Sequence, residues 1–272
     1  MFHERVVKNI QNDLRNYITK HGLKSLILGV SGGADSALVA ALANPVCLEL
    51  KIPLIGFSIP IETNKQDELL RARMVGKSFC TTFYEMDLTP VFKQEQEGLW
   101  GVVNKLFPEC DYAIANGNLK ARMRMRLLYH VAGITGGLVL GTDNFTEYNV
   151  GFWTLFGDVG DYGMIQNLWK TEVYQLMRFI AEDCNNQEKY DALMACVNAT
   201  PTDGLGITSS DLEQLGAPTY DEVDKILQMW LQNRAGRDAY EDHPVIKRHL
   251  KTSYKRCHPY NIPRDVVLKG AQ

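Results

Sequence analysis

The feature that most constrains the fold is a glycine-rich segment between two apolar stretches near the start of the chain. Residues 25–30 form a short, continuous apolar run, which is typical of a strand buried on both faces of a parallel sheet. The segment SGGADS, residues 31–36, follows directly. Residues 37–42 are rich in alanine and leucine and predict a helix, with Pro45 marking a kink or a stop. A strand, a glycine loop and a helix in this order favour an α/β fold.

Helical and strand patterns alternate along the rest of the chain. Apolar residues recur at helical spacing from Val6 to Ile18 and predict an N-terminal amphipathic helix that ends at Gly22. Further strands are expected at 53–59, 81–86 and 137–141, and helices at 67–79, 119–134 and 171–181. Residues 185–216 are polar and contain Pro and Gly, which indicates a loop-rich segment. The alternation predicts a Rossmann-like open parallel sheet with helices on both faces.

The residues of the glycine loop suit the binding of a phosphate. The backbone N–H groups of a strand-to-helix loop converge on an anion at the positive end of the helix. Gly32 and Gly33 allow close backbone approach, Ser31 and Ser36 add hydroxyl donors, and Asp35 is able to hold a divalent cation. An ordinary turn with a helix cap uses the same residue types, so the loop alone leaves both interpretations open. A Walker A loop and a dinucleotide fingerprint are both excluded, because the required Lys-Ser/Thr and third glycine are missing.

Composition excludes several other classes of protein. The 29 basic and 32 acidic residues leave a net charge of −3, which does not favour a nucleic-acid partner. The six cysteines include no CxxC pair and the six histidines show no metal-ligand spacing, so we expect reduced thiols and no zinc site. The charged N-terminus and the lack of an 18-residue apolar run argue against a signal peptide or a membrane partner, and predict a cytoplasmic protein.

Motifs along nearly the whole chain resemble one family. The SGGxDS loop is similar to the pyrophosphate loop of the ATP pyrophosphatase superfamily, whose adenine nucleotide alpha-hydrolase-like fold matches the predicted α/β sheet. Residues 117–126, 141–147 and 151–158 resemble the GNxxARxRM, GTDxxxE and GFFTKYGD motifs of NAD synthetases. Residues 201–202, 211–216, 220–224 and 254–256 are similar to the family's PTAD, DExxLG, YxxID and HKR. The chain is thereby identified as a member of the NH3-dependent NAD synthetase family.

The resemblance assigns roles residue by residue. It implies an ATP site, a magnesium site made by Asp35 and Glu147, and catalytic roles for Asp35 and Lys170. Taken without the resemblance, Arg122 is an ordinary solvated arginine on a helix and Glu147 suits the first turn of a helix. The implied ATP-binding residues are Gly29, Val30, Ser31, Gly32, Gly33, Ala34, Asp35, Ser36, Thr142, Lys170 and Thr202. The implied substrate-binding residues are Arg122, Phe152, Asp161, Tyr254 and Lys255.

The reaction implied by the resemblance is the amidation of nicotinic acid adenine dinucleotide (deamido-NAD). ATP and Mg²⁺ convert the carboxylate to an acyl-adenylate with release of pyrophosphate, and ammonia then displaces AMP. We expect a single synthetase domain over residues 1–272, with an N-terminal helix, a C-terminal extension and no glutaminase domain. The family also implies a homodimer, with which the apolar face of the N-terminal helix is consistent.

Alternatives to this reaction remain open at the sequence level. Leu155 and Tyr254 stand where the family often has lysine and histidine, so nicotinate mononucleotide is an alternative substrate. A nucleotide-binding regulator without catalysis is an alternative of another class, which the presence of both Asp35 and Glu147 disfavours. A tRNA-modifying relative is disfavoured by the missing CxxC pair and the acidic pI near 6.1.

Overall fold

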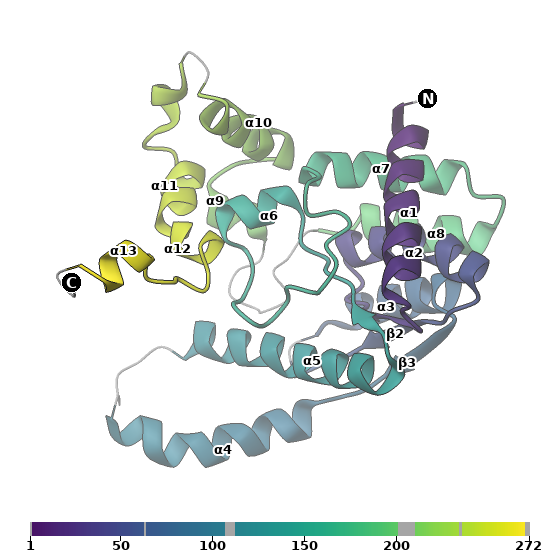
Figure 1. The fold of residues 1–272 in the computed structure, drawn as a ribbon, viewed down its shortest axis with the longest axis horizontal. Helices are drawn as coiled ribbons and strands as arrows, with labels where there is room; N and C mark the ends of the chain where they lie inside the picture. Colours follow the sequence, from purple (N-terminus) through teal and green to yellow (C-terminus); the bar gives the residue numbers. More distant parts are fainter. Residues whose placement is uncertain (1, 63, 107–111, 201–209, 234–235, 270–272) are drawn as a thin grey trace.

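The strands of the protein form an all-parallel sheet, as the sequence predicts. The computed structural model describes residues 2–62, 64–106, 112–200, 210–233 and 236–269 (Figure 1). Within these residues the sheet has four strands in the order β3-β2-β1-β4. Leu26 of β1 pairs with Leu54 of β2 on one side and with Leu138 of β4 on the other. The strands are β1 (Leu26–Gly29), β2 (Leu54–Ser58), β3 (Thr82–Glu85) and β4 (Leu138–Val139).

Helices cover both faces of this sheet. Alternate side chains of β1 point to opposite faces, and because they are apolar on both, each face is buried by helices. Leu26 and Leu28 pack in a core shared with the helices of one face, whereas Ile27 packs with Phe92 and Leu128 on the other. Figure 1 shows the two sets of helices on either side of the sheet. The first face is covered by α1 (Phe2–His21), α2 (Ala34–Leu50), α3 (Gln66–Phe79), α7 (Lys170–Glu182) and α8 (Gln187–Val197), and the second by α4 (Thr89–Leu106) and α5 (Ala113–Thr135).

The remaining helices form a separate group beyond the carboxyl ends of the strands. Several of them enclose a third apolar cluster, which includes Val150, Leu215 and Val223. Figure 1 shows this group above α5 and apart from α1, α7 and α8. Its elements are α6 (Phe145–Val150), α9 (Asp211–Leu215), α10 (Tyr220–Leu231), the 3-10 helix η1 (Arg237–Tyr240), α11 (Pro244–Lys251), α12 (Ser253–Arg256) and α13 (Arg264–Val267).

Several predicted elements differ from those of the structure. The expected loop over 185–216 is wrong in part, because residues 187–197 and 211–215 are helical and bury Leu193, Cys196 and Leu215. Pro45 lies inside α2 and does not end it, because the helix continues to Leu50. Helix α4 has no counterpart in the prediction.

The apolar face of α1 is used inside the chain. Val6, Val7 and Ile10 pack against the core beneath α2, and Leu14 and Ile18 are buried. The N-terminal helix face therefore gives no support to a homodimer. Among the described residues, no helix is both long and apolar enough to cross a bilayer.

Candidate active site

The candidate site lies at the point where the order in which the chain adds strands to the sheet reverses. The chain leaves β1 toward β2 on one side, while β4 lies on the other side of β1. In open α/β sheets, ligands bind at the carboxyl ends of the strands at such a switch point. The loop of residues 30–33 follows β1, and the loop of residues 140–144 follows β4. The topology therefore brings together two segments that are more than a hundred residues apart in sequence.

The glycine loop after β1 is closed by its own serine side chains. The hydroxyl of Ser36 accepts a hydrogen bond from the Ser31 N–H at 3.2 Å and lies 3.0 Å from the Ser31 hydroxyl. The Gly33 N–H donates to the Ser31 hydroxyl at 3.2 Å. Gly32 has φ +82, and a Cβ there would lie 2.3 Å from the Glu68 carbonyl oxygen of α3. Glycine is therefore required at this position by both backbone angle and space.

Three charged side chains from three elements meet beside this loop. The Lys170 ammonium donates to Asp35 Oδ2 and, at 3.1 Å, to Glu147 Oε1. The Asn144 side chain joins the same two residues: its Nδ2 donates to Asp35 Oδ1 at 2.8 Å, and its Oδ1 accepts from the backbone N–H of Glu147 at 3.0 Å. We call Asp35, Glu147 and Lys170 the carboxylate–lysine cluster.

The charges of this cluster are largely removed from water. Lys170 is 4% exposed. Burial alone would lower the pKa of Lys170, but the charges of Asp35 and Glu147 outweigh it and hold the pKa well above its ordinary value. Burial, and then repulsion by Asp35, raises the pKa of Glu147 to about 7. Two carboxylates against one ammonium leave net negative charge, which a divalent cation would offset.

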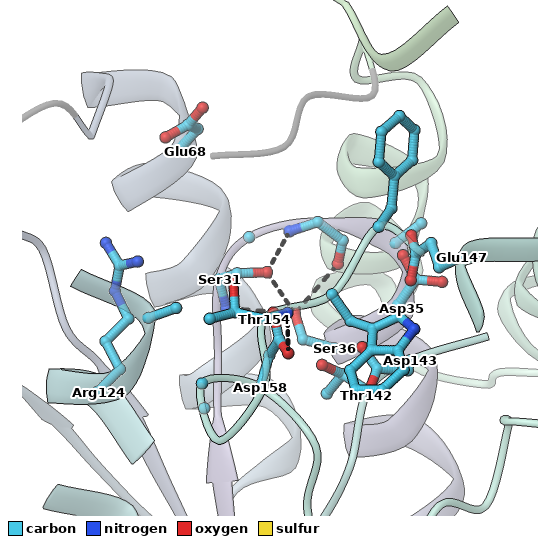
Figure 2. A pocket seen from close by; sticks show the side chains of 18 of the residues that line it. Ser31, Asp35, Ser36, Glu68, Arg124, Thr142, Asp143, Glu147, Thr154 and Asp158 are labelled. Carbon is cyan, nitrogen blue, oxygen red and sulfur yellow. Dashed lines mark hydrogen bonds between the residues drawn. The ribbon is translucent and has the colours of Figure 1, made fainter. Parts of the chain in front are cut away.

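The cluster opens into a cavity of about 550 Å³, within the ~300–1,000 Å³ typical of small-molecule sites. Figure 2 shows Asp35 and Glu147 on one side of this pocket and Glu68 and Arg124 on the opposite side. We call this the loop cavity. The residues of the sequence prediction that line it are Gly29, Val30, Ser31, Gly32, Gly33, Ala34, Asp35, Ser36, Thr142, Glu147, Phe152, Lys170, Tyr254 and Lys255.

A second cavity, of about 610 Å³, lies beside the first. We call it the side cavity. Arg122 lines it, and the Arg122 Nε donates to the Leu155 carbonyl oxygen at 3.1 Å. The two cavities share four lining residues, which are Met125, Asp143, Trp153 and Lys255. Of the predicted substrate residues, Arg122 lines the side cavity, Phe152 and Tyr254 line the loop cavity, and Lys255 lines both.

Asp161 is a predicted site residue that lines neither cavity. Thr202 lies outside the described residues. The Asp161 carboxylate accepts from the Val139 N–H at 3.0 Å and from the Tyr129 hydroxyl at 3.0 Å. These bonds fasten the loop after β4 to the end of the strand and to α5. A substrate-binding role for Asp161 stays a prediction.

Other polar residues of the site were missed by the sequence analysis. Arg124 lines the loop cavity and donates to the Ile59 carbonyl oxygen at 2.9 Å and to Asn64 Oδ1 at 3.1 Å. Asp143 and Asp158 line it as well; burial raises the pKa of Asp143 well above its ordinary value and that of Asp158 to about 7. Arg124 and Asp158 stand inside the motifs used for the resemblance, but nothing in residue type alone marks them as cavity residues.

The fold and the site together define a class. A parallel sheet carries a glycine loop that suits phosphate at its switch point, and a buried carboxylate–lysine cluster lies beside that loop. This is an α/β nucleotide-binding enzyme of the ATP pyrophosphatase type.

Comparison with known proteins identifies the family within this class. A family model described as NAD synthase matches residues 6–259. The NH3-dependent NAD(+) synthetase of Methanococcus aeolicus is 30% identical over 238 residues, which cover 86% of each chain. The protein therefore belongs to the NAD synthase family, whose members are ligases that form a C–N bond and use ATP as co-substrate.

Solved structures of low sequence identity share the fold. The NMN synthetase from Francisella tularensis is 22% identical, with a TM-score of 0.77 over 96% of this chain and 98% of that one. An NH3-dependent NAD synthetase from Campylobacter jejuni is 20% identical, with a TM-score of 0.72 over 97% of this chain and 100% of that one. Both likenesses extend over essentially the full set of elements described above.

Proposed function

We propose that the protein amidates deamido-NAD to NAD with ATP and ammonia. The observation that carries this proposal is the carboxylate–lysine cluster beside the glycine loop, with a second cavity sharing its wall. The loop cavity would take ATP, and the side cavity would take part of the acid substrate. Membership of the NAD synthase family supports the identity of that acid.

The first step joins the acid to AMP. A carboxylate oxygen of the substrate attacks the α-phosphorus of ATP, the bond to the bridging oxygen breaks, and pyrophosphate leaves. The N–H groups of residues 31–36 would hold the pyrophosphate, and the Lys170 ammonium would offset phosphate charge. Positioning and electrostatic stabilisation of this kind supply most of the rate in phosphoryl chemistry.

The second step releases AMP. Ammonia attacks the carbonyl carbon of the acyl-adenylate, and the C–O bond to AMP breaks as the amide loses a proton. A free carboxylate resists this attack because oxide is a poor leaving group, whereas AMP departs readily. Binding of the adenylate inside the loop cavity would limit its contact with water, which would otherwise hydrolyse it.

Asp35 and Glu147 fit the requirements for Mg²⁺. Their carboxylate oxygens are hard donors of the kind that Mg²⁺ prefers, and both face the same buried ammonium. In the part of the chain that the structure describes, no group of three or more His, Cys, Asp and Glu side chains is placed to hold a metal. Phosphate oxygens of ATP would complete the ligands. The ion would neutralise phosphate charge as pyrophosphate leaves.

Lys255 lies in the wall that the two cavities share, and Phe152 lines the loop cavity. Lys255 donates to the Gly151 carbonyl oxygen at 2.8 Å, and the Arg248 guanidinium lies 4.0 Å from the centre of the Phe152 ring. We assign Arg122, Phe152, Asp161, Tyr254 and Lys255 to the acid substrate, and Thr142 and Thr202 to ATP. We further propose that the enzyme acts as a homodimer.

Nicotinate mononucleotide is the second candidate substrate. Leu155 lines the side cavity and Tyr254 lines the loop cavity, and both depart from the family motif. The name of the Francisella relative, NMN synthetase, favours the same alternative.

A direct comparison of substrates tests the proposal. Purified protein with ATP, Mg²⁺ and ammonium should release pyrophosphate and form the amide faster with deamido-NAD than with nicotinate mononucleotide. A strong preference for the mononucleotide would overturn the substrate assignment. Failure to release pyrophosphate with either acid would instead favour a non-catalytic nucleotide-binding regulator.

A further inference from the structure

Asp224 is a buried carboxylate that the proposed chemistry does not use. It belongs to α10, is 2% exposed, and lines neither the loop cavity nor the side cavity. Its Oδ1 accepts from the Thr146 hydroxyl at 2.5 Å. Its Oδ2 accepts from the Thr171 N–H at 3.0 Å and the Thr171 hydroxyl at 2.8 Å. A buried carboxylate is costly unless it is hydrogen-bonded, and these three donors satisfy it.

The three donors come from the first turns of two helices that carry cluster residues. Thr146 directly precedes Glu147 in α6, and Thr171 directly follows Lys170 in α7. The Thr146 hydroxyl oxygen also accepts from the Lys170 N–H at 2.9 Å. Asp224 and Thr146 therefore tie the start of α6 to the start of α7.

The start of α7 depends on acceptors from outside the helix. The first N–H groups of a helix have no partner within it. The residue before α7 is Trp169, whose indole has no oxygen to accept from them. The Thr146 hydroxyl and the Asp224 carboxylate take these N–H groups instead, at Lys170 and Thr171. The position of the Lys170 backbone is thus set by α6 and α10.

We propose that Asp224, acting through Thr146, is a positioning residue that holds Glu147 and Lys170 against Asp35. This inference rests on the proposed function, because its consequence is the geometry of the adenylation step. A displacement of about 1 Å in a catalytic group costs on the order of a hundredfold in rate. The helix α10 thereby acts on chemistry in a cavity that Asp224 does not reach.

Substitution of Thr146 isolates the tie with little change in volume. Thr146→Val removes the hydroxyl that joins Asp224 to the Lys170 N–H. We expect turnover to fall about tenfold or more, the Mg²⁺ concentration for half-maximal rate to rise, and the KM for the acid to change little. Thr146→Ser keeps the hydroxyl and should restore both values. Asp221→Asn, an exposed change on the same helix, should match the unchanged protein.

Hydrogen exchange provides a readout that does not depend on activity. In Thr146→Val, the amides at the starts of α6 and α7 should exchange faster, while those of α10 keep their protection. If Thr146→Val lowers turnover only in proportion to the folded fraction, with unchanged Mg²⁺ dependence and exchange, the tie is merely structural and the inference is overturned. Inactivity of the unchanged protein with both acids would defeat the proposed function instead, and the exchange result would still decide whether Asp224 holds the two helices together.

Discussion

At the scale of single residues, the candidate site is held by a few buried polar contacts. The Asn144 side chain joins the Asp35 carboxylate to the backbone N–H of Glu147. The Lys170 ammonium lies between the Asp35 and Glu147 carboxylates, which would otherwise repel each other. Removing one member of such a group leaves its buried partners unsatisfied, which is costly. Conservative substitutions therefore separate chemistry from folding better than truncations do.

Asp35→Asn should abolish adenylation while the fold survives. The amide keeps the size of the side chain but removes the charge that faces Lys170 and the proposed Mg²⁺. Turnover should fall by at least about a hundredfold, because charge stabilisation in a buried site is worth several kcal/mol. Pyrophosphate release and circular dichroism measure the two properties. Glu49→Gln, in the same helix and 53% exposed, is the control and should change neither pyrophosphate release nor the circular dichroism spectrum. Full activity of Asp35→Asn would exclude Asp35 from the metal site.

Asp158 should make the free energy of unfolding depend on pH. Burial raises the pKa of Asp158 from 3.8 to about 7 in the folded protein. Between about pH 4 and about pH 7 the folded state keeps a proton that the unfolded state releases, so this contribution to stability is lost as pH rises. The side chain of Asp158→Asn does not titrate in this pH range. The free energy of unfolding of this variant should gain on that of the unchanged protein as pH rises from about 4 to about 7. The gain is at most about 1.4 kcal/mol per unit of difference between the folded and unfolded pKa values.

Denaturant unfolding at a series of pH values measures this difference. Asn still accepts the Thr154 N–H that donates to the Asp158 carboxylate at 2.8 Å, so the local turn is preserved. A difference that stays constant across the pH range would show that Asp158 has an ordinary pKa.

At the scale of elements, the site depends on close packing between the glycine loop and α3. Arg71 of α3 donates its Nε to the Gly32 carbonyl oxygen at 2.9 Å, and the α3 backbone lies directly against the loop. The loop is thus held open to the cavity by a helix that also lines it through Glu68 and Arg71. A change that pushes α3 away should disturb both stability and ATP binding.

Gly32→Ala is that change. Its Cβ would lie 2.3 Å from the Glu68 carbonyl oxygen and 3.0 Å from the Ala72 nitrogen, and φ is +82. We expect the loss of more than about 2 kcal/mol of stability and of measurable ATP binding. Gly22→Ala is the matched control, since φ is +64 and nothing lies within 4 Å, so only backbone strain of about 1 kcal/mol remains. Equal effects in calorimetry would show that the contact with α3 is unimportant.

The sequence predicted elements well where burial and periodicity agree. The run before Ser31 is buried on both faces, and its pattern identified β1 and the loop correctly. Prediction failed in α8, because the Pro and Gly residues near its end hid the helical pattern of Ala192, Leu193 and Cys196. It failed in α4, where Gly98 and Gly101 lower helix propensity and docking of Phe92 in the core outweighs them.

The site was predictable only in part, for a related reason. The glycine loop is a local pattern, so its anion-binding geometry follows from sequence. The contact of Asn144 with Asp35 joins residues 109 apart, and that of Thr146 with Asp224 joins residues 78 apart. Such contacts follow from the strand order and from the packing of α10, which no local spacing encodes.

At the scale of the whole molecule, the proposed homodimer needs a surface that the chain leaves exposed. The apolar face of α1 is already packed against the core. On α4, Leu99, Val102 and Leu106 are 54%, 60% and 66% exposed and share one side of the helix. Figure 1 shows α4 at the outer edge of the molecule, beneath α5. Exposed apolar rows of this kind mark interfaces between proteins.

Val102→Glu should therefore weaken the dimer without unfolding the subunit. A carboxylate at a 60% exposed position stays solvated in the monomer, but it would be buried without a partner in an interface through α4. Sedimentation velocity over a range of concentrations should show a rise of at least about tenfold in the dimer dissociation constant, with an unchanged melting profile at low concentration. Leu48→Glu, at a 62% exposed position on α2, is the control. If the two variants sediment alike, α4 does not form the interface; if the unchanged protein sediments as a monomer at every concentration, the homodimer itself is excluded.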